Sequence, residues 1–150
     1  WRWWCRVPGC AGVTVVDPGG TATGTWPISR DADVVRVRQA VRAAAVACRL
    51  SLVDQTKLVT AASELARNTL IHGGGGRAVV ERVATDRRAG VRVVFADTGA
   101  GIADLDLAFS DGYTTGSGLG LGGARRLVDE FDIETTPGHG TTITVVKWAR

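Results

Sequence analysis

Apolar residues recur at helical spacing in two consecutive stretches of the chain. The first stretch follows Asp33, and either Asp31 or Asp33 can cap its start. Its apolar positions are Val34, Val37, Val41, Ala44, Ala45 and Cys48. The second stretch begins near Asp54 and ends at His72, because the four glycines that follow cannot sustain a helix. It runs through Leu58, Ala62, Leu65 and Thr69. The pattern therefore predicts two successive helices, each with one buried face.

Strand-like segments dominate the second half of the chain. Residues 78–83 and 91–95 are rich in β-branched residues, and the turn-forming sequence 86–90 between them predicts a hairpin. A third helix is predicted over residues 124–131, followed by a short run at 133–135 and a strand over 141–148. Hairpin-connected strands with the helices grouped apart predict an α+β fold, a two-layer α/β sandwich with a mixed, mainly antiparallel sheet.

The first 24 residues differ in composition from the rest of the chain. They are rich in Gly, Pro and Thr and are expected to form a flexible N-terminal extension. The β-branched run at residues 13–16 could nevertheless form a strand. Residues 25–150 are expected to fold as one domain.

Composition and charge narrow the class of protein. No stretch approaches the roughly 18 uninterrupted apolar residues of a membrane span, and the N-terminus lacks the apolar segment of a secretory signal, so a cytoplasmic protein without membrane contact is expected. The three cysteines cannot all pair within the chain, which argues against a disulfide framework. The net charge is +3 with dispersed arginines, a weak argument for nucleic acid that suits an acidic partner protein equally well. No nucleic-acid partner is expected.

Glu64 and Asn68 are the first residues that point to chemistry. Their separation of four places both side chains on one face of the second predicted helix, beside its buried stripe. An amide oxygen is a hard ligand suited to Mg²⁺, and a carboxylate beside it can accept a proton. The alternative is that both are ordinary solvated residues of a helix surface.

Asp97 ends a predicted buried strand and is followed by Gly99 and Gly101. A carboxylate in such a place is costly unless it has a partner, and the exocyclic amine of a purine is one. The glycines would allow a flat ring to approach the backbone without meeting a Cβ atom. The alternative is an ordinary turn after a strand.

A glycine-rich loop at residues 116–123 runs directly into the third predicted helix. Free backbone N–H groups and the positive end of a helix dipole together form a phosphate cradle. Gly118, Gly120 and Gly123 also satisfy the dinucleotide pattern GxGxxG, but the βαβ unit that gives that pattern meaning is lacking. A Walker P-loop is excluded because Ala124 stands where a lysine is required. A last turn, at residues 137–140, leads to the hydroxyls of Thr141 and Thr142, which could support Asp97.

In chain order, these four elements resemble the N, G1, G2 and G3 boxes of the GHKL ATPases. The resemblance covers roughly residues 25–148. Segments 63–68, 111–115 and 145–148 are most similar to the small serine-protein-kinase and anti-sigma-factor branch, and within it to the stressosome switch kinases. The resemblance implies the Bergerat ATP-binding fold, with ATP and Mg²⁺ as cofactors.

The same resemblance implies a role for each matching residue. Asn68 matches the Mg²⁺ ligand, Glu64 the candidate base, and Arg67 a residue that the subgroup shares at its catalytic site. Asp97 matches the adenine reader, with Thr141 behind it, although Thr142 could take that place. Gly99 and Gly101 match the platform for the ring. The phosphate loop is implied to comprise Gly116, Gly118, Leu119, Gly120, Leu121 and Gly122.

The function implied is that of a serine/threonine-protein kinase. It would use Mg-ATP to phosphorylate a STAS-domain antagonist protein in a bacterial partner-switching pathway of stress or sigma-factor regulation. The resemblance also allows three further partners: a PP2C-type phosphatase, a sigma factor and a second copy of the chain. The alternative on the same fold is an anti-sigma factor that sequesters its target. A histidine kinase is less favoured because the chain has two histidines and no upstream helical hairpin, and a nucleic-acid-binding domain is the remaining alternative.

Overall fold

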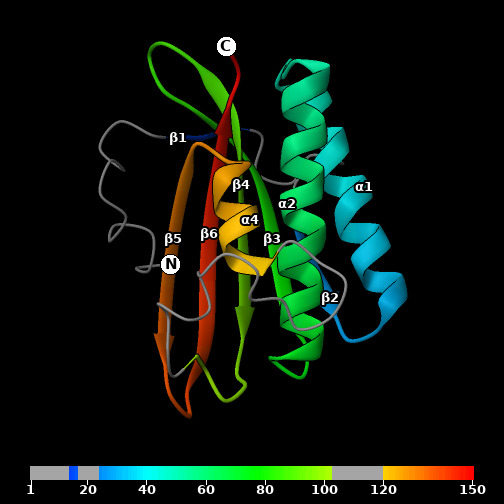
Figure 1. The fold of residues 1–150 in the computed structure, drawn as a ribbon. Helices are drawn as coiled ribbons and strands as arrows, with labels where there is room; N and C mark the ends of the chain where they lie inside the picture. Colours follow the sequence, from blue (N-terminus) through cyan, green and yellow to red (C-terminus); the bar gives the residue numbers. More distant parts are fainter. Residues whose placement is uncertain (1–13, 17–23, 103–119) are drawn as a thin grey trace.

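An antiparallel sheet with helices packed on one face makes up the described part of the chain (Figure 1). The computed structural model describes residues 14–16, 24–102 and 120–150. Within these ranges the sheet has six strands: β1 Thr14–Val16, β2 Gly24–Ile28, β3 Gly76–Ala84, β4 Ala89–Asp97, β5 Glu130–Thr136 and β6 Gly140–Trp148. The order is β1-β3-β4-β6-β5, with β2 also on β3, and every pairing is antiparallel. The predicted α+β two-layer architecture is confirmed, and where a mixed, mainly antiparallel sheet was predicted, the described strands pair only in antiparallel fashion.

Strand register aligns the apolar residues of the three central strands on the face that the helices cover. Val93 of β4 lies between Val80 of β3 and Val145 of β6, and all three are fully buried. Phe95 lies in the same way between Ala78 and Ile143. Because side chains alternate along a strand, this register places a continuous apolar layer under the helices.

The N-terminal strands share one edge of β3. β1 pairs with residues 82–84 of β3, and β2 pairs with residues 76–80. The strand expected within residues 13–16 is therefore confirmed as β1. Where the extension ends and the domain begins stays a prediction.

Two long helices form the second layer, and a hydrogen bond between a side chain and the backbone marks the start of each. Helix α1 spans Asp31–Ala47, and the Asp33 carboxylate accepts hydrogen bonds from the Ser29 N–H at 2.9 Å and the Arg30 N–H at 3.2 Å. Both bonds lower the pKa of Asp33, and the bond from the Ser29 N–H has the largest effect. Helix α2 spans Leu52–Ile71 and begins at Ser51, whose hydroxyl accepts the Asp54 N–H. No helix in the described ranges is long and apolar enough to cross a membrane.

The turn between α1 and α2 contains an unusual backbone conformation. Arg49 follows the C-terminus of α1 with φ at 59°, the left-handed region in which glycine is favoured. The Leu50 N–H bonds back to the Ala45 carbonyl, and this closes the last turn of the helix. Arg49 is the one non-glycine residue with positive φ in the described part of the chain.

The third helix differs from its prediction. Helix α4 spans Gly120–Arg126, whereas residues 124–131 were predicted helical. Phe131 instead belongs to β5, where it pairs with Val145 and packs against the core. The Asp129 N–H bonds to the Val146 carbonyl at 3.0 Å, so pairing with β6 has replaced the next helical turn. The apolar spacing around Phe131 suits a helix, but the sheet decides its conformation.

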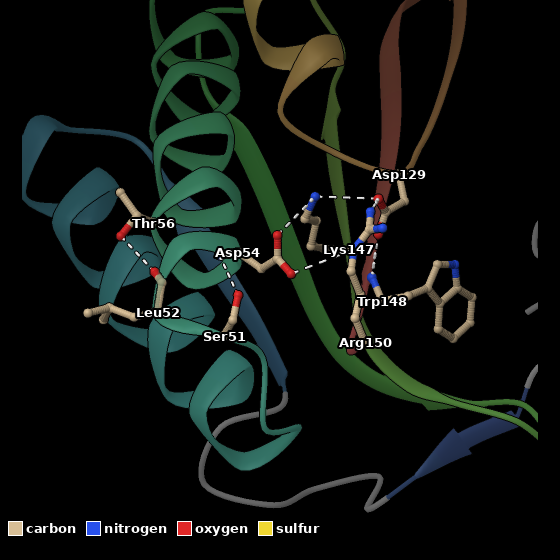
Figure 2. A network of polar contacts seen from close by, with 8 residues as sticks. All are labelled: Ser51, Leu52, Asp54, Thr56, Asp129, Lys147, Trp148 and Arg150. Carbon is tan, nitrogen blue, oxygen red and sulfur yellow. Dashed lines mark hydrogen bonds and ion pairs between the residues drawn. The ribbon is translucent and has the colours of Figure 1, made fainter.

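A buried ionic network ties the start of α2 to the end of β6 (Figure 2). The Lys147 ammonium, on a side chain only 5% exposed, lies 3.5 Å from the Asp54 carboxylate and 3.4 Å from that of Asp129. Burial opposes ionisation of Asp129, but the Trp148 N–H and the charges of Lys147 and Arg150 outweigh it and lower its pKa. This network fixes α2 at the end remote from Asn68, about 21 Å away along the helix.

Candidate functional site

Asp97 is the last residue of β4, and backbone N–H groups hold one of its carboxylate oxygens. Gly99 donates to Oδ1 at 2.9 Å and Thr141 donates to the same atom at 3.3 Å. Within the described residues, no hydrogen bond reaches the second oxygen, Oδ2. The fold thus fixes the orientation of the carboxylate and leaves one oxygen able to accept a hydrogen bond from a ligand.

Three glycines allow three segments to meet around Asp97. A Cβ on Gly73, at the end of α2, would collide with the Asp97 side chain, and one on Gly140 would collide with the Asp97 carbonyl oxygen. A Cβ on Gly99 would lie 2.8 Å from the Gly73 Cα. These approaches are closer than side chains permit, so only glycine fits at the three positions.

Thr141 stands beside Asp97 and is supported by a second threonine. Its hydroxyl oxygen lies 2.9 Å from that of Thr135, on the neighbouring strand β5. The Thr135 hydroxyl also accepts the Ile102 N–H at 2.9 Å. Of the two threonines left open by the sequence, Thr141 is the one that contacts Asp97 through its N–H, while Thr142 pairs with Ala96.

Glu64, Arg67 and Asn68 lie together on the last three turns of α2. The Arg67 guanidinium is 3.9 Å from the Glu64 carboxylate, with Arg67 47% and Glu64 16% exposed. The Asn68 carbonyl accepts the N–H of His72 at 2.9 Å and that of Gly73 at 3.3 Å. Because Gly73 also touches Asp97, the polar face of α2 and the end of β4 belong to one end of the molecule.

The side chain of Asn68 is half-buried on this face, and within the described ranges it makes no hydrogen bond. Its amide oxygen therefore has no competing donor there. No group of three or more His, Cys, Asp or Glu residues that could hold a metal is found in the described part of the chain. A metal ion in this region would depend on Asn68 and on oxygens supplied by a ligand.

Part of the predicted phosphate loop lies on α4. Gly120, Leu121 and Gly122 form the first turn of this helix, and Leu121 is buried in the core. Helix α4 lies in front of the sheet beside α2 (Figure 1), and the two helices are in contact. Gly120 has φ at +68°, a conformation that favours glycine. Gly116, Gly118 and Leu119 lie outside the described residues.

Gly101 is held against the β5–β6 turn. Its φ is +74°, and a Cβ there would lie 2.5 Å from the Thr136 carbonyl oxygen. The neighbouring Ala100 carbonyl accepts the Gly138 N–H at 2.7 Å. The loop that follows Asp97 is therefore clamped to the turn before β6.

Sequence reasoning missed two residues of this site. Gly73 was visible only as the first glycine of a helix stop, and nothing in its neighbours indicated the contact with Asp97. Thr135 resembles any β-branched residue of a strand, because its partners Thr141 and Ile102 are brought to it by sheet pairing and loop folding.

Several known proteins are similar to this chain in amino-acid sequence. The family described as "Histidine kinase-, DNA gyrase B-, and HSP90-like ATPase" matches residues 53–149. Serine/threonine-protein kinase RsbT of Bacillus subtilis (strain 168) is 40% identical over 120 residues, which cover 79% of this chain and 90% of the relative. Anti-sigma F factor of Thermoanaerobacter sp. (strain X514) is 28% identical over 119 residues, covering 74% and 82%. That of Clostridium novyi (strain NT) is 31% identical over 115 residues, covering 69% and 80%.

The matched region contains the described candidate residues of all four motifs, from Glu64 and Asn68 on α2 to Thr141 on β6. The predicted resemblance to the GHKL ATPases and to a stressosome switch kinase is confirmed. ATP is the nucleotide that an ATPase domain of this kind uses. With an antiparallel sheet, helices on one face and an aspartate held by glycines at the end of a central strand, the chain belongs to the histidine kinase-, DNA gyrase B- and HSP90-like ATPase family.

Proposed function

We propose that this protein is a serine/threonine-protein kinase that transfers a phosphoryl group from ATP to a hydroxyl on a partner protein. The observation that carries the proposal is the Asp97 carboxylate, which has Oδ1 held by two backbone N–H groups and Oδ2 available. Kinase activity is the named activity of the relative RsbT, which is 40% identical over nearly its whole length.

Asp97 would recognise the purine. Its Oδ2 would accept a hydrogen bond from the exocyclic amine of adenine, while the close packing of Gly99 on Gly73 and of Gly101 on Thr136 would hold the loop after Asp97 in place. A purine with a carbonyl at this position, such as guanine, offers no donor and would face the carboxylate with an acceptor. The same aspartate therefore both binds adenine and discriminates against guanine.

Asn68 would hold Mg²⁺ through its amide oxygen. Proteins commonly bind Mg²⁺ at phosphate-transfer sites through one or two side chains, the substrate phosphates and water, and a single half-buried amide oxygen fits that donor set. When bound, Mg²⁺ neutralises charge on the phosphates. Backbone N–H groups of the glycine loop at residues 116–122 would bind the same phosphates.

Glu64 would accept the proton of the attacking hydroxyl. It lies one helical turn before Asn68 and is largely buried, with Arg67 at its side. A positioned general base contributes about 10²- to 10⁴-fold to rate. Arg67 completes this polar surface, and its half-exposed charge is suited to contact an acidic group on the partner.

The partner would be a STAS-domain antagonist, and a PP2C-type phosphatase or sigma factor would belong to the same switch. The decisive assay mixes the protein, labelled ATP, Mg²⁺ and a purified STAS-domain protein, followed by detection of phosphoserine or phosphothreonine. Glu64→Ala and Asn68→Ala together should abolish transfer, while Lys57→Ala, on an exposed position of the same helix, should not change it. Transfer that persists in the double variant would remove both residues from the mechanism.

A second candidate function has specific support in the anti-sigma F factors, which are 28–31% identical to this chain. On this alternative the protein would bind and sequester a sigma factor, and phosphorylation of an antagonist would serve only as a switch. Co-purification with a sigma factor, lost when the unphosphorylated antagonist is added without ATP, would favour it over a kinase that only activates a downstream protein.

A further inference from the structure

Thr135 joins three segments of the chain through one hydroxyl group. It accepts the Ile102 N–H at 2.9 Å, lies 2.9 Å from the Thr141 hydroxyl and lies 3.3 Å from the Gly140 carbonyl oxygen. Ile102 lies in the segment that follows Asp97, and Thr141 is the second residue of β6. The side chain thus links this segment to the strand that stands behind the carboxylate.

These contacts complete a ring of hydrogen bonds that includes the Asp97 carboxylate. Asp97 Oδ1 accepts N–H groups from Gly99 and from Thr141. The Thr141 hydroxyl meets that of Thr135, and Thr135 accepts the Ile102 N–H, three residues after Gly99. Asp97 lies at one end of this ring and Thr135 at the other, so loss of the Thr135 hydroxyl would release the segment that ends at Ile102, while sheet pairing keeps Thr141 in place.

The three contacts of the Thr135 hydroxyl can all be made at once. It accepts the Ile102 N–H and donates its one hydrogen to the Gly140 carbonyl oxygen at 3.3 Å. The 2.9 Å bond between the two threonine hydroxyls is then donated by Thr141.

We propose that Thr135 is a positioning residue for nucleotide recognition, which acts by clamping residues 98–102 to Thr141 beside Asp97. The inference rests on the proposed use of Asp97 to read adenine. A role limited to hairpin stability would affect folding alone, since the Thr135 backbone pairs with Thr141 in β6 whatever its side chain. A positioning role instead changes affinity and local protection while the rest of the fold stays intact.

The test compares Thr135→Val, which keeps the shape and removes the hydroxyl, with Thr135→Ser, which keeps the hydroxyl. Thr136→Val is the matched control, because Thr136 is the adjacent, exposed threonine of the same strand. Titration with ATP gives the Kd, phosphotransfer at saturating ATP gives kcat, and amide hydrogen exchange on the nucleotide-free protein reports on Ile102. Thermal melting checks that each variant is folded.

Thr135→Val should raise the Kd for ATP about tenfold. This change corresponds to about 1.4 kcal/mol, which is within the net contribution of one hydrogen bond. Exchange of the Ile102 amide should accelerate at least tenfold. The value of kcat should stay within twofold, Thr135→Ser should bind ATP within threefold of the parent, and Thr136→Val should match the parent throughout. A Kd and an Ile102 exchange rate that are both unchanged in folded Thr135→Val would overturn the inference.

Two results separate this inference from the proposed function. If the parent binds no ATP, the proposed function fails, whereas Ile102 exchange is measured without nucleotide and still decides the clamp. If Thr135→Val does not fold, the parent protein itself gives the answer: the clamp requires the Ile102 amide to be protected in the nucleotide-free state. Exchange of that amide at the rate of an unstructured peptide would overturn the clamp without any variant.

Discussion

Replacing Gly73 by Ala places a methyl group where the Asp97 side chain lies. The added Cβ would sit 2.5 Å from the Asp97 Cβ and 2.6 Å from its Oδ2, against the roughly 3.5 Å that carbon atoms need. The carboxylate must therefore move by about 1 Å. A hydrogen bond of ordinary length does not survive such a displacement. Because a hydrogen bond to a charged group contributes about 1.5–3 kcal/mol, the Kd for ATP should rise about 10- to 100-fold.

The assay is a titration with ATP and with GTP, accompanied by thermal melting. Overpacking costs about 1–3 kcal/mol of stability, so Gly73→Ala should also melt a few degrees lower. Gly74→Asn is the matched control: a Cβ there meets nothing within 4 Å, and asparagine tolerates its φ of +70°. Gly74→Asn should bind ATP as the parent does. A folded Gly73→Ala that binds ATP within threefold of the parent would refute the placement of Asp97 in the nucleotide pocket.

Three further predictions address recognition and stability. Asp97→Asn should weaken ATP binding and reduce the preference for ATP over GTP by at least tenfold in competition titrations, because the amide can donate to a guanine carbonyl. An unchanged preference would contradict purine recognition by Asp97. Arg49→Gly should stabilise the protein by about 1 kcal/mol in urea unfolding, because glycine adopts φ near 59° without a Cβ penalty, and lower stability would show that the Arg49 side chain contributes more than its strain costs. Asp129→Asn should be less stable than the parent at pH 7, and the difference in stability should shrink as the pH falls below 3.8. Because the pKa of Asp129 is lower in the folded protein than in the unfolded chain, the ionised carboxylate stabilises the fold above the unfolded pKa. This stabilisation is lost as the carboxylate protonates. A difference that is constant from pH 7 to pH 3 would contradict this assignment.

Local patterns predicted most of the helices and strands because their causes lie within a few residues. The apolar spacing of α1 and α2, the glycine stop after His72 and the hairpin between β3 and β4 are each written in contiguous sequence. The third helix was placed too late because the spacing of Leu127, Val128 and Phe131 suits a helix. The partner that draws Phe131 into β5 is Val145, fourteen residues further along the chain.

The candidate site likewise contains residues that the sequence predicted and a contact that only the structure revealed. Glu64 and Asn68 were predicted to share a face because helix geometry alone requires it, and Asp97 was found because it ends a strand before two glycines. That Gly73 supports Asp97 could not be read from the sequence, because the contact forms between the end of a helix and the end of a strand.

The sequence by itself determined the class of fold, the family and the residue types available to bind a nucleotide. Only the tertiary structure decided which oxygen of Asp97 is held, which of two neighbouring threonines holds it and how Thr135 closes the ring behind them. The physical reason is that helix and strand periodicity arise from neighbouring residues, whereas these hydrogen bonds join segments whose proximity depends on sheet register and on close approach at glycines.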